Sequence, residues 1–129
     1  MLTERSPYVS VENVETDNPS GSATGIDVTR VLFETWCAHE LRWVVYGPNT
    51  PPVWAQVAQH LRGYLGCLWV SEALQGDKVR EAFFVTCDQS TMTPEDIRDG
   101  HLICLVGVAL VTPGEFTLYR IHIQQKKSW

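Results

Sequence analysis

The chain has 129 residues and a mass of 14.6 kDa, which suits one domain with a single core. Hydrophobic residues make up 44% and charged residues 19%, which argues against wholesale disorder, and the net charge of −5 disfavours binding to bare nucleic acid. No apolar stretch reaches the roughly 20 residues of a transmembrane helix. The first residues, MLTERSPYVS, lack the apolar core of a signal peptide, so we expect synthesis in the cytoplasm.

The N-terminal region, residues 1–26, is predicted to form an arm and a linker. Residues 7–14 alternate apolar and polar side chains, which is the period of a β-strand. Residues 16–25 (TDNPSGSATG) are rich in turn-forming residues and predict a flexible linker. Because one strand beside a linker cannot bury a core, this strand must pair with a sheet edge, in its own subunit or in a neighbour.

The compact part begins with two predicted helices. Asp27 is a suitable N-cap for a helix over residues 28–41. Residues 43–46 (WVVY) predict a short buried strand. Thr50 is expected to cap a second helix that ends near residue 74. The apolar face of this second helix has helical spacing and consists of Val53, Trp54, Val57, Leu61, Tyr64, Leu65, Leu68 and Trp69.

Three further strands are predicted in the second half of the chain, over residues 82–87, 101–111 and 116–124. The second is nearly all apolar and should be central in the sheet. A capping motif predicts a helical turn over residues 93–99. The expected class is α/β in the α+β sense: a mostly antiparallel sheet packed on two helices, with extended N- and C-terminal strand arms.

Residue patterns give little sign of catalysis, so we expect no cofactor and no metal site. No CxxC, HExxH or phosphate-binding loop is present. The four cysteines, Cys37, Cys67, Cys87 and Cys104, are predicted to be small buried residues without disulfides. A nucleophile pair of Cys87 or Cys104 with His101 stays open, and with it the alternative of a small cytosolic thiol enzyme.

Several short motifs occur in order within residues 27–124. They are Trp43-x-Val45-x-x-Pro48-Asn49 with Trp54, Leu74-x-Gly76, Ala82-Phe83-Phe84-Val85-x-Cys87-Asp88, Thr91-Met92-Thr93-x-x-Asp96-Ile97-x-x-Gly100 and Ile103-x-x-Val106-Gly107-Val108-Ala109-x-Val111-x-Pro113-x-Glu115-Phe116. Together they resemble the C-terminal domain of contractile tail sheath proteins, from myophages, phage-like bacteriocins and related injection systems. Residues 7–14 resemble the strand that begins a sheath subunit. Typical sheath subunits carry several hundred further residues where this chain has a short linker.

The resemblance implies a structural, non-enzymatic subunit that self-assembles into hexameric rings or a helical sheath. Such a sheath surrounds an inner tube protein and contracts to drive the tube through a target envelope. Implied partners are copies of itself, the tube protein, the baseplate and longer sheath paralogues, without nucleic acid or membrane. The implied location is a virion tail or an extracellular or cytoplasmic contractile particle. An alternative is an accessory adaptor or cap with the same fold at the baseplate or tail end.

In that family, arms add strands to the sheets of adjacent subunits. The resemblance implies that this chain consists of an arm (1–26), a domain (27–124) and a basic tail (125–129). The candidate inter-subunit strand residues are Tyr8, Val9, Val11, Val14, Leu118, Arg120, Ile121 and Ile123. The arm is acidic and the tail basic, so candidate charge contacts are Glu12, Glu15, Lys126 and Lys127. Asp77 and Lys78 occupy an ordinary solvated turn or touch the tube or a neighbour.

Overall fold

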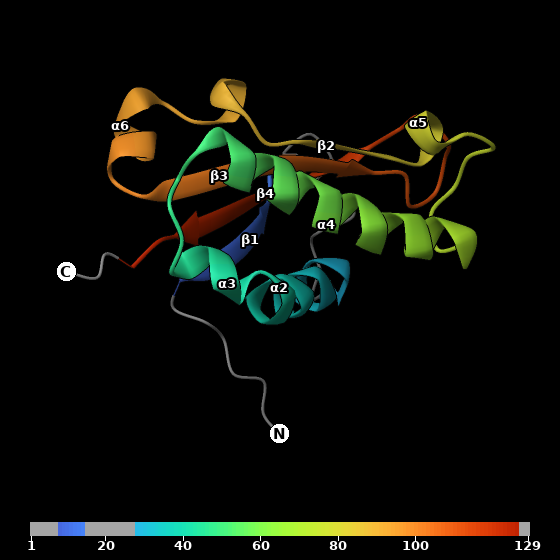
Figure 1. The fold of residues 1–129 in the computed structure, drawn as a ribbon. Coiled ribbons are helices and arrows are strands. Elements are labelled where there is room, and N and C mark those ends of the chain that lie inside the picture. Colours follow the sequence, from blue (N-terminus) through green and yellow to red (C-terminus); the bar gives the residue numbers. More distant parts are fainter. Residues whose placement is uncertain (1–7, 15–27, 127–129) are drawn as a thin grey trace.

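The computed structural model describes residues 8–14 and 28–126, and its centre is a four-stranded antiparallel sheet (Figure 1). The strands follow the spatial order β1-β4-β3-β2 and are β1 (Val9–Asn13), β2 (Phe83–Thr86), β3 (His101–Val108) and β4 (Thr117–Gln124). The helices are α2 (Val28–Glu40), α3 (Arg42–Val45), α4 (Pro51–Val70), α5 (Val79–Ala82), the 3₁₀ turn η1 (Gln89–Thr91) and α6 (Pro94–Arg98). The predicted α+β class is confirmed, with α2 and α4 as the main helices.

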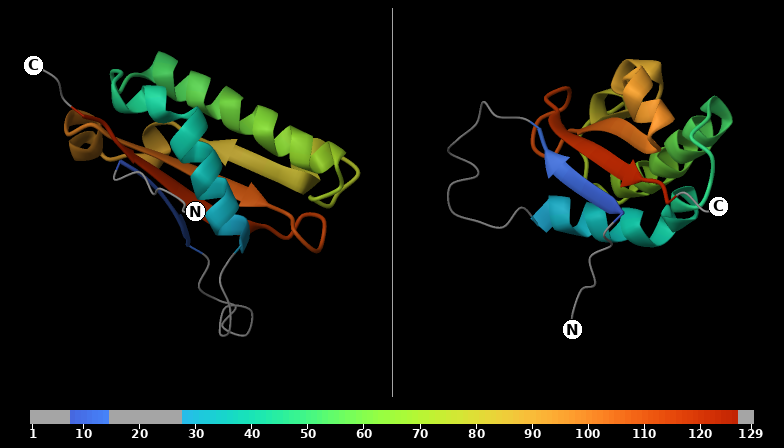
Figure 2. Two further views of the ribbon diagram at one scale, coloured as in Figure 1. Left: turned by 90° about the horizontal axis from the view of Figure 1, so that it is seen from below. Right: turned by 90° about the vertical axis from the view of Figure 1, so that its left-hand side faces the viewer.

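Both main helices lie over the same face of the sheet, as Figure 2 shows. Successive side chains of a strand point to opposite faces, so every second residue contributes to the core. The buried strand residues that face the helices include Phe83, Val85, Leu102, Cys104, Val106, Tyr119, Ile121 and Ile123. None of the described helices combines the length and apolar composition that crossing a bilayer requires.

Helix α4 differs from its sequence prediction at both ends. Thr50 is the N-cap residue of α4, but its side chain makes no capping hydrogen bond. Asn49 connects this end of α4 to the sheet instead, because its Oδ1 accepts from Trp54 Nε1 at 2.6 Å and its Nδ2 donates to the His101 carbonyl at 3.2 Å. The helix ends at Val70, four residues before the predicted end.

The predicted strand at residues 43–46 is wrong, because this segment is the helical turn α3. Val44 N donates to the Leu41 carbonyl at 3.0 Å and Tyr46 N donates to the Trp43 carbonyl at 3.3 Å. Four apolar residues are too few to reveal a period, so a buried strand and a buried helical turn look alike in the sequence. Burial of Val44 and Val45 satisfies the apolar pattern in either conformation.

The capping motif and the central strand were predicted correctly. Thr93 Oγ1 accepts from Asp96 N at 3.0 Å, and Asp96 Oδ2 accepts from Thr93 N at 2.9 Å, which is a capping box. Strand β3 lies between β2 and β4, although it ends at Val108. The chain then turns outward, and Val111 is 84% exposed.

Candidate functional site

The two predicted arm strands lie side by side in this chain. Strand β1 pairs antiparallel with β4, with Val9 opposite Ile123, Val11 opposite Ile121 and Glu12 opposite Arg120. Val9 and Val11 are 4% and 2% exposed, so both enter the core. The single chain therefore shows pairing within its own sheet, one of the two arrangements that the sequence allowed.

Backbone groups at both ends of β1 show which residues face β4. Gln124 N donates to the Tyr8 carbonyl at 2.8 Å, and Val14 N donates to the Leu118 carbonyl at 3.0 Å. In an antiparallel pair, alternate residues direct their backbone groups to opposite sides of the strand. The N–H and C=O of Val11 therefore point away from β4, toward the outer edge of the sheet.

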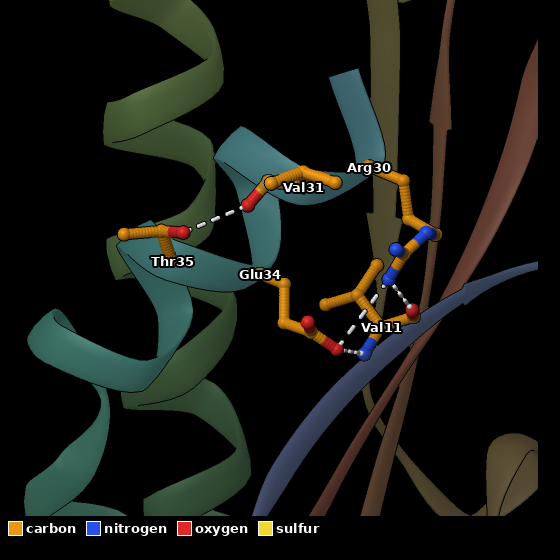
Figure 3. A network of polar contacts seen from close by, with 5 residues as sticks. All are labelled: Val11, Arg30, Val31, Glu34 and Thr35. Atoms are coloured by element: carbon orange, nitrogen blue, oxygen red, sulfur yellow. Dashed lines mark hydrogen bonds and ion pairs between the residues drawn. The ribbon is translucent and has the colours of Figure 1, made fainter. Parts of the chain in front are cut away.

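Helix α2 supplies the partners at this outer edge (Figure 3). Val11 N donates to Glu34 Oε2 at 2.9 Å, and Arg30 Nη1 donates to the Val11 carbonyl at 3.0 Å. The two side chains also form an ion pair, with 3.6 Å between Arg30 Nη1 and Glu34 Oε2. Together they offer one acceptor and one donor, as a residue of a neighbouring strand would. We call β4, Arg30 and Glu34 the strand site.

Burial makes these contacts strong. Glu34 is only 8% exposed, and a carboxylate in such a position requires partners because burial of an unpaired charge is costly. Hydrogen bonds to charged groups are roughly twice as strong as neutral ones. Glu34 also acts on Cys37, one turn along α2: burial first, and then the negative charge of Glu34, raise the pKa of the Cys37 thiol.

Sequence reasoning missed Arg30 and Glu34. A usable signal was present, since Glu34 lies beside Phe33 and three residues before Cys37, on what becomes the buried face of α2. The i,i+4 spacing of Arg30 and Glu34 is also that of a helical ion pair. A charged pair on the apolar side of an amphipathic helix indicates a buried polar partner, here a backbone 23 residues away.

The C-terminal segment also contacts the domain through residues that the sequence did not single out. Gln125 is 7% exposed, and its Nε2 donates to the carbonyls of Val44 at 3.1 Å and Pro48 at 2.9 Å. Lys126 N donates to the Val45 carbonyl at 2.7 Å, while its side chain is exposed. Turn α3 thus holds the end of the described chain beside β4.

The predicted charge contacts have different positions. Glu12 and Arg120 face each other across β1 and β4, with 3.6 Å between Oε1 and Nη1, and their side chains are 63% and 48% exposed. Glu15 and Lys127 lie outside the described residues. Asp77 and Lys78 are exposed in the turn before α5, where Asp77 N donates to Glu81 Oε1 at 3.0 Å.

The face of the sheet opposite the main helices carries a histidine pair. His101 Nδ1 and His122 Nε2 are 2.8 Å apart, and the rings stack with centroids 4.9 Å apart. Burial, followed by the proximity of His101, lowers the pKa of His122. In residues 8–14 and 28–126, no three His, Cys, Asp or Glu side chains gather as a group that could hold a metal ion.

Cys104 and His101 do not form the nucleophile pair that the sequence left open. Cys104 is fully buried beneath the helices, whereas His101, three residues away on the same strand, belongs to the opposite face. A hydrogen bond with Cys87, followed by burial, raises the pKa of the Cys104 thiol. Cys37 is buried as predicted and Cys87 is half-buried, whereas the prediction that Cys67 is buried is wrong, because Cys67 is exposed.

This chain is similar to parts of two contractile injection systems. It matches a chain in the cryo-EM structure of the anti-feeding prophage (AFP) baseplate, with 35% identity and a TM-score of 0.59. It also matches a chain in the cryo-EM structure of an extracellular contractile injection system, the PVC sheath complex in the contracted state, with 33% identity and a TM-score of 0.57.

Both matches cover 78% of this chain but only 27% and 28% of the chains in those structures. The chain therefore spans about a quarter of the length of these relatives. No protein-family model and no curated protein matches the chain. The similarity thus concerns one domain of larger proteins in the two particles.

Proposed function

We propose that this chain is a structural component of a contractile injection particle. The observation that carries the proposal is the similarity itself, at 33–35% identity over 78% of the chain, to chains in two such particles. Identity at this level over most of a domain supports a shared role in assembly as well as a shared fold. The expected partners are other proteins of the particle, and the expected role is architectural rather than catalytic.

The finer proposal is a sheath subunit reduced to one domain. The match to a contracted sheath complex supports it, as does the motif resemblance across residues 27–124. In this role, copies of the chain form hexameric rings around a tube protein, stack into a helical sheath and contact the baseplate or longer sheath chains. Contraction then moves the tube through a target envelope.

Strand exchange is the proposed link between copies. The residues expected to form it lie on β1 and β4, which already pair with each other in the single chain. Backbone pairing is the same whether the strand comes from the same chain or from a second copy. Residues 15–27 connect Val14 to α2, and a segment of this length can span at most about 45 Å.

A second candidate is an adaptor or cap at the end of a sheath. The match to a chain in the AFP baseplate favours it. An adaptor with this fold uses the same strand pairing but stops after one ring. The two candidates differ in whether assembly continues.

Imaging and mass measurement separate these candidates. The purified chain, alone and with an inner tube protein, is analysed by light scattering after size exclusion and by negative-stain electron microscopy. Tubes or stacked rings support a sheath subunit, and one finite ring supports an adaptor. A monomer at all concentrations, with and without the tube protein, contradicts both.

A further inference from the structure

At Val11, the outer edge of β1 is bonded by two side chains rather than by another strand. Glu34 accepts the outward N–H of Val11 at 2.9 Å and Arg30 donates to its outward C=O at 3.0 Å. Every residue except proline offers this same N–H and C=O pair. The contact therefore recognises a strand as backbone and does not depend on which residue occupies the position of Val11.

Selectivity comes from the other contacts of the strand. Val9 and Val11 place their side chains in the core, whereas the alternate residues Ser10 and Glu12 are exposed. The strand site thus accepts an extended segment with apolar residues two positions apart. Within this chain that pattern is present in residues 8–14, so an identical segment of a second copy satisfies every contact that β1 makes.

We propose that Arg30 and Glu34 are the capture residues for the arm strand of a second copy of this chain, an inference that rests on the proposed strand exchange. They fix the register, because only one residue of the incoming strand lies against both side chains. They also occupy the outward N–H and C=O of Val11, so a further strand cannot hydrogen-bond to β1 at this residue. The strand site is therefore suited to hold one arm.

The test uses the full chain carrying Arg120→Lys, which puts an amine opposite Glu12 at an exposed pair now 3.6 Å apart. Isotopically heavy and light copies are mixed and treated with a water-soluble carbodiimide, which joins the Glu12 carboxylate to the new amine with loss of water. Linked peptides with one heavy and one light half report strand pairing between copies. Amide hydrogen exchange of residues 8–14, relative to β3, reports occupancy of the strand site.

Glu34→Ala in this background should lower the protection of the Val11 amide at least about tenfold relative to β3, the size expected for one lost hydrogen bond to a charge. It should also reduce the mixed-isotope product. Glu34→Gln keeps an acceptor oxygen and should give a smaller loss. Thr35→Ala is the matched control, because Thr35 is exposed on the same helix and its hydroxyl donates to the Val31 carbonyl, at 2.9 Å.

Unchanged protection and unchanged mixed-isotope product in Glu34→Ala would overturn the capture role. If Glu34→Ala lowers the protection of β3 as much as that of the Val11 amide, the Glu34→Gln variant decides the question. Equal protection of the Val11 amide in Glu34→Gln and Thr35→Ala would then also overturn the capture role. If the Arg120→Lys chain with Glu34 intact gives only same-isotope products, the proposed strand exchange is wrong. Arg30 and Glu34 then bind only the β1 strand of their own chain. A particle role established by imaging would survive that last result, so the two proposals fail separately.

Discussion

The two edges of the sheet are protected in different ways. At the β1 edge, Arg30 and Glu34 bond the outward backbone of Val11. At the β2 edge, Ala109 N donates to the Ala82 carbonyl at 2.8 Å, so the alternation directs the backbone of Phe83 and Val85 outward. The Phe83 N–H donates to the Val79 carbonyl at the end of α5. In the described part of the chain, no side chain hydrogen-bonds the outward groups of Val85.

The β2 edge relies on charge and shortness instead. A hollow of about 460 Å³ lies beside this edge. Its lining includes three positively charged side chains, Arg62, Lys78 and Arg80, and no acidic one. Strand β2 has only four residues. Short strands and positive side chains are common means of discouraging unwanted strand pairing. The comparison indicates that the β1 edge is built to hold one strand and the β2 edge to repel others.

Proline substitution gives the largest expected difference between the edges. Val11→Pro removes the N–H that Glu34 accepts, so the buried carboxylate loses one donor and keeps its ion pair with Arg30, and the change should cost about 3 kcal/mol of unfolding free energy. Val85→Pro removes an outward N–H that has no described partner, and should cost about 1–2 kcal/mol through altered packing and backbone geometry. Urea unfolding of both variants measures the difference. Equal losses would contradict the distinction between the edges.

The next effect concerns how β2 is held to β3. A Cβ added at Gly107 would collide with the ring of Phe84, which also packs edge-on against Phe116 with centroids 5.1 Å apart. Gly107→Ala should therefore displace the Phe84 ring and cost about 1–3 kcal/mol. Because the two residues touch, Gly107→Ala combined with Phe84→Ala should cost less than the sum of the single changes. Additive losses in thermal unfolding would show that the ring adapts freely.

An intermediate effect on stability is expected from pH, through His122 on β4. Burial and then His101 lower the folded-state pKa of His122 below its usual 6.5, Arg120 also lowers it, and Asp96 and Glu12 partly counteract this. Around and below pH 6.5, His122 binds a proton more readily in the unfolded chain than in the folded chain. The free energy of unfolding should therefore fall as the pH drops from about 7.5 toward 5.

His122→Gln should flatten this pH dependence of the melting temperature. His39→Gln is the control, since the His39 side chain is 71% exposed. An equally steep profile in His122→Gln would assign the pH dependence to other groups. Amide exchange at pH 5 and 7.5 would then show whether β1 or β2 loosens first.

The smallest effect is expected from the exposed ion pair that joins β1 to β4. Glu12→Gln should change the free energy of unfolding by only about 0–1 kcal/mol, because exposed charge pairs contribute little and are screened by salt. Arg62→Gln at the β2 edge should be similarly mild for the monomer but should increase self-association if the cations repel other strands. Light scattering at low and high salt tests this, and unchanged association in Arg62→Gln would remove the role assigned to those charges.

Local patterns in the sequence determined most of the elements. The N-cap residue Asp27 predicted α2, the 3.6-residue period predicted α4, alternation predicted β1 and β4, and the Thr93–Asp96 capping box predicted α6. These features depend on residues close in sequence, so a short window contains the physical cause. The fold class followed from their order, and the arm-strand residues of the candidate site followed from the alternation and from the resemblance.

Tertiary structure alone decided the rest. The apolar residues 43–46 became part of a helical turn and its C-cap rather than a strand, because what they contact lies elsewhere in the chain. The partner of β1 and the role of Glu34 depend on bringing α2 beside a backbone 23 residues away. Whether a buried carboxylate is tolerated depends on which donors the fold places around it, and no local pattern specifies them.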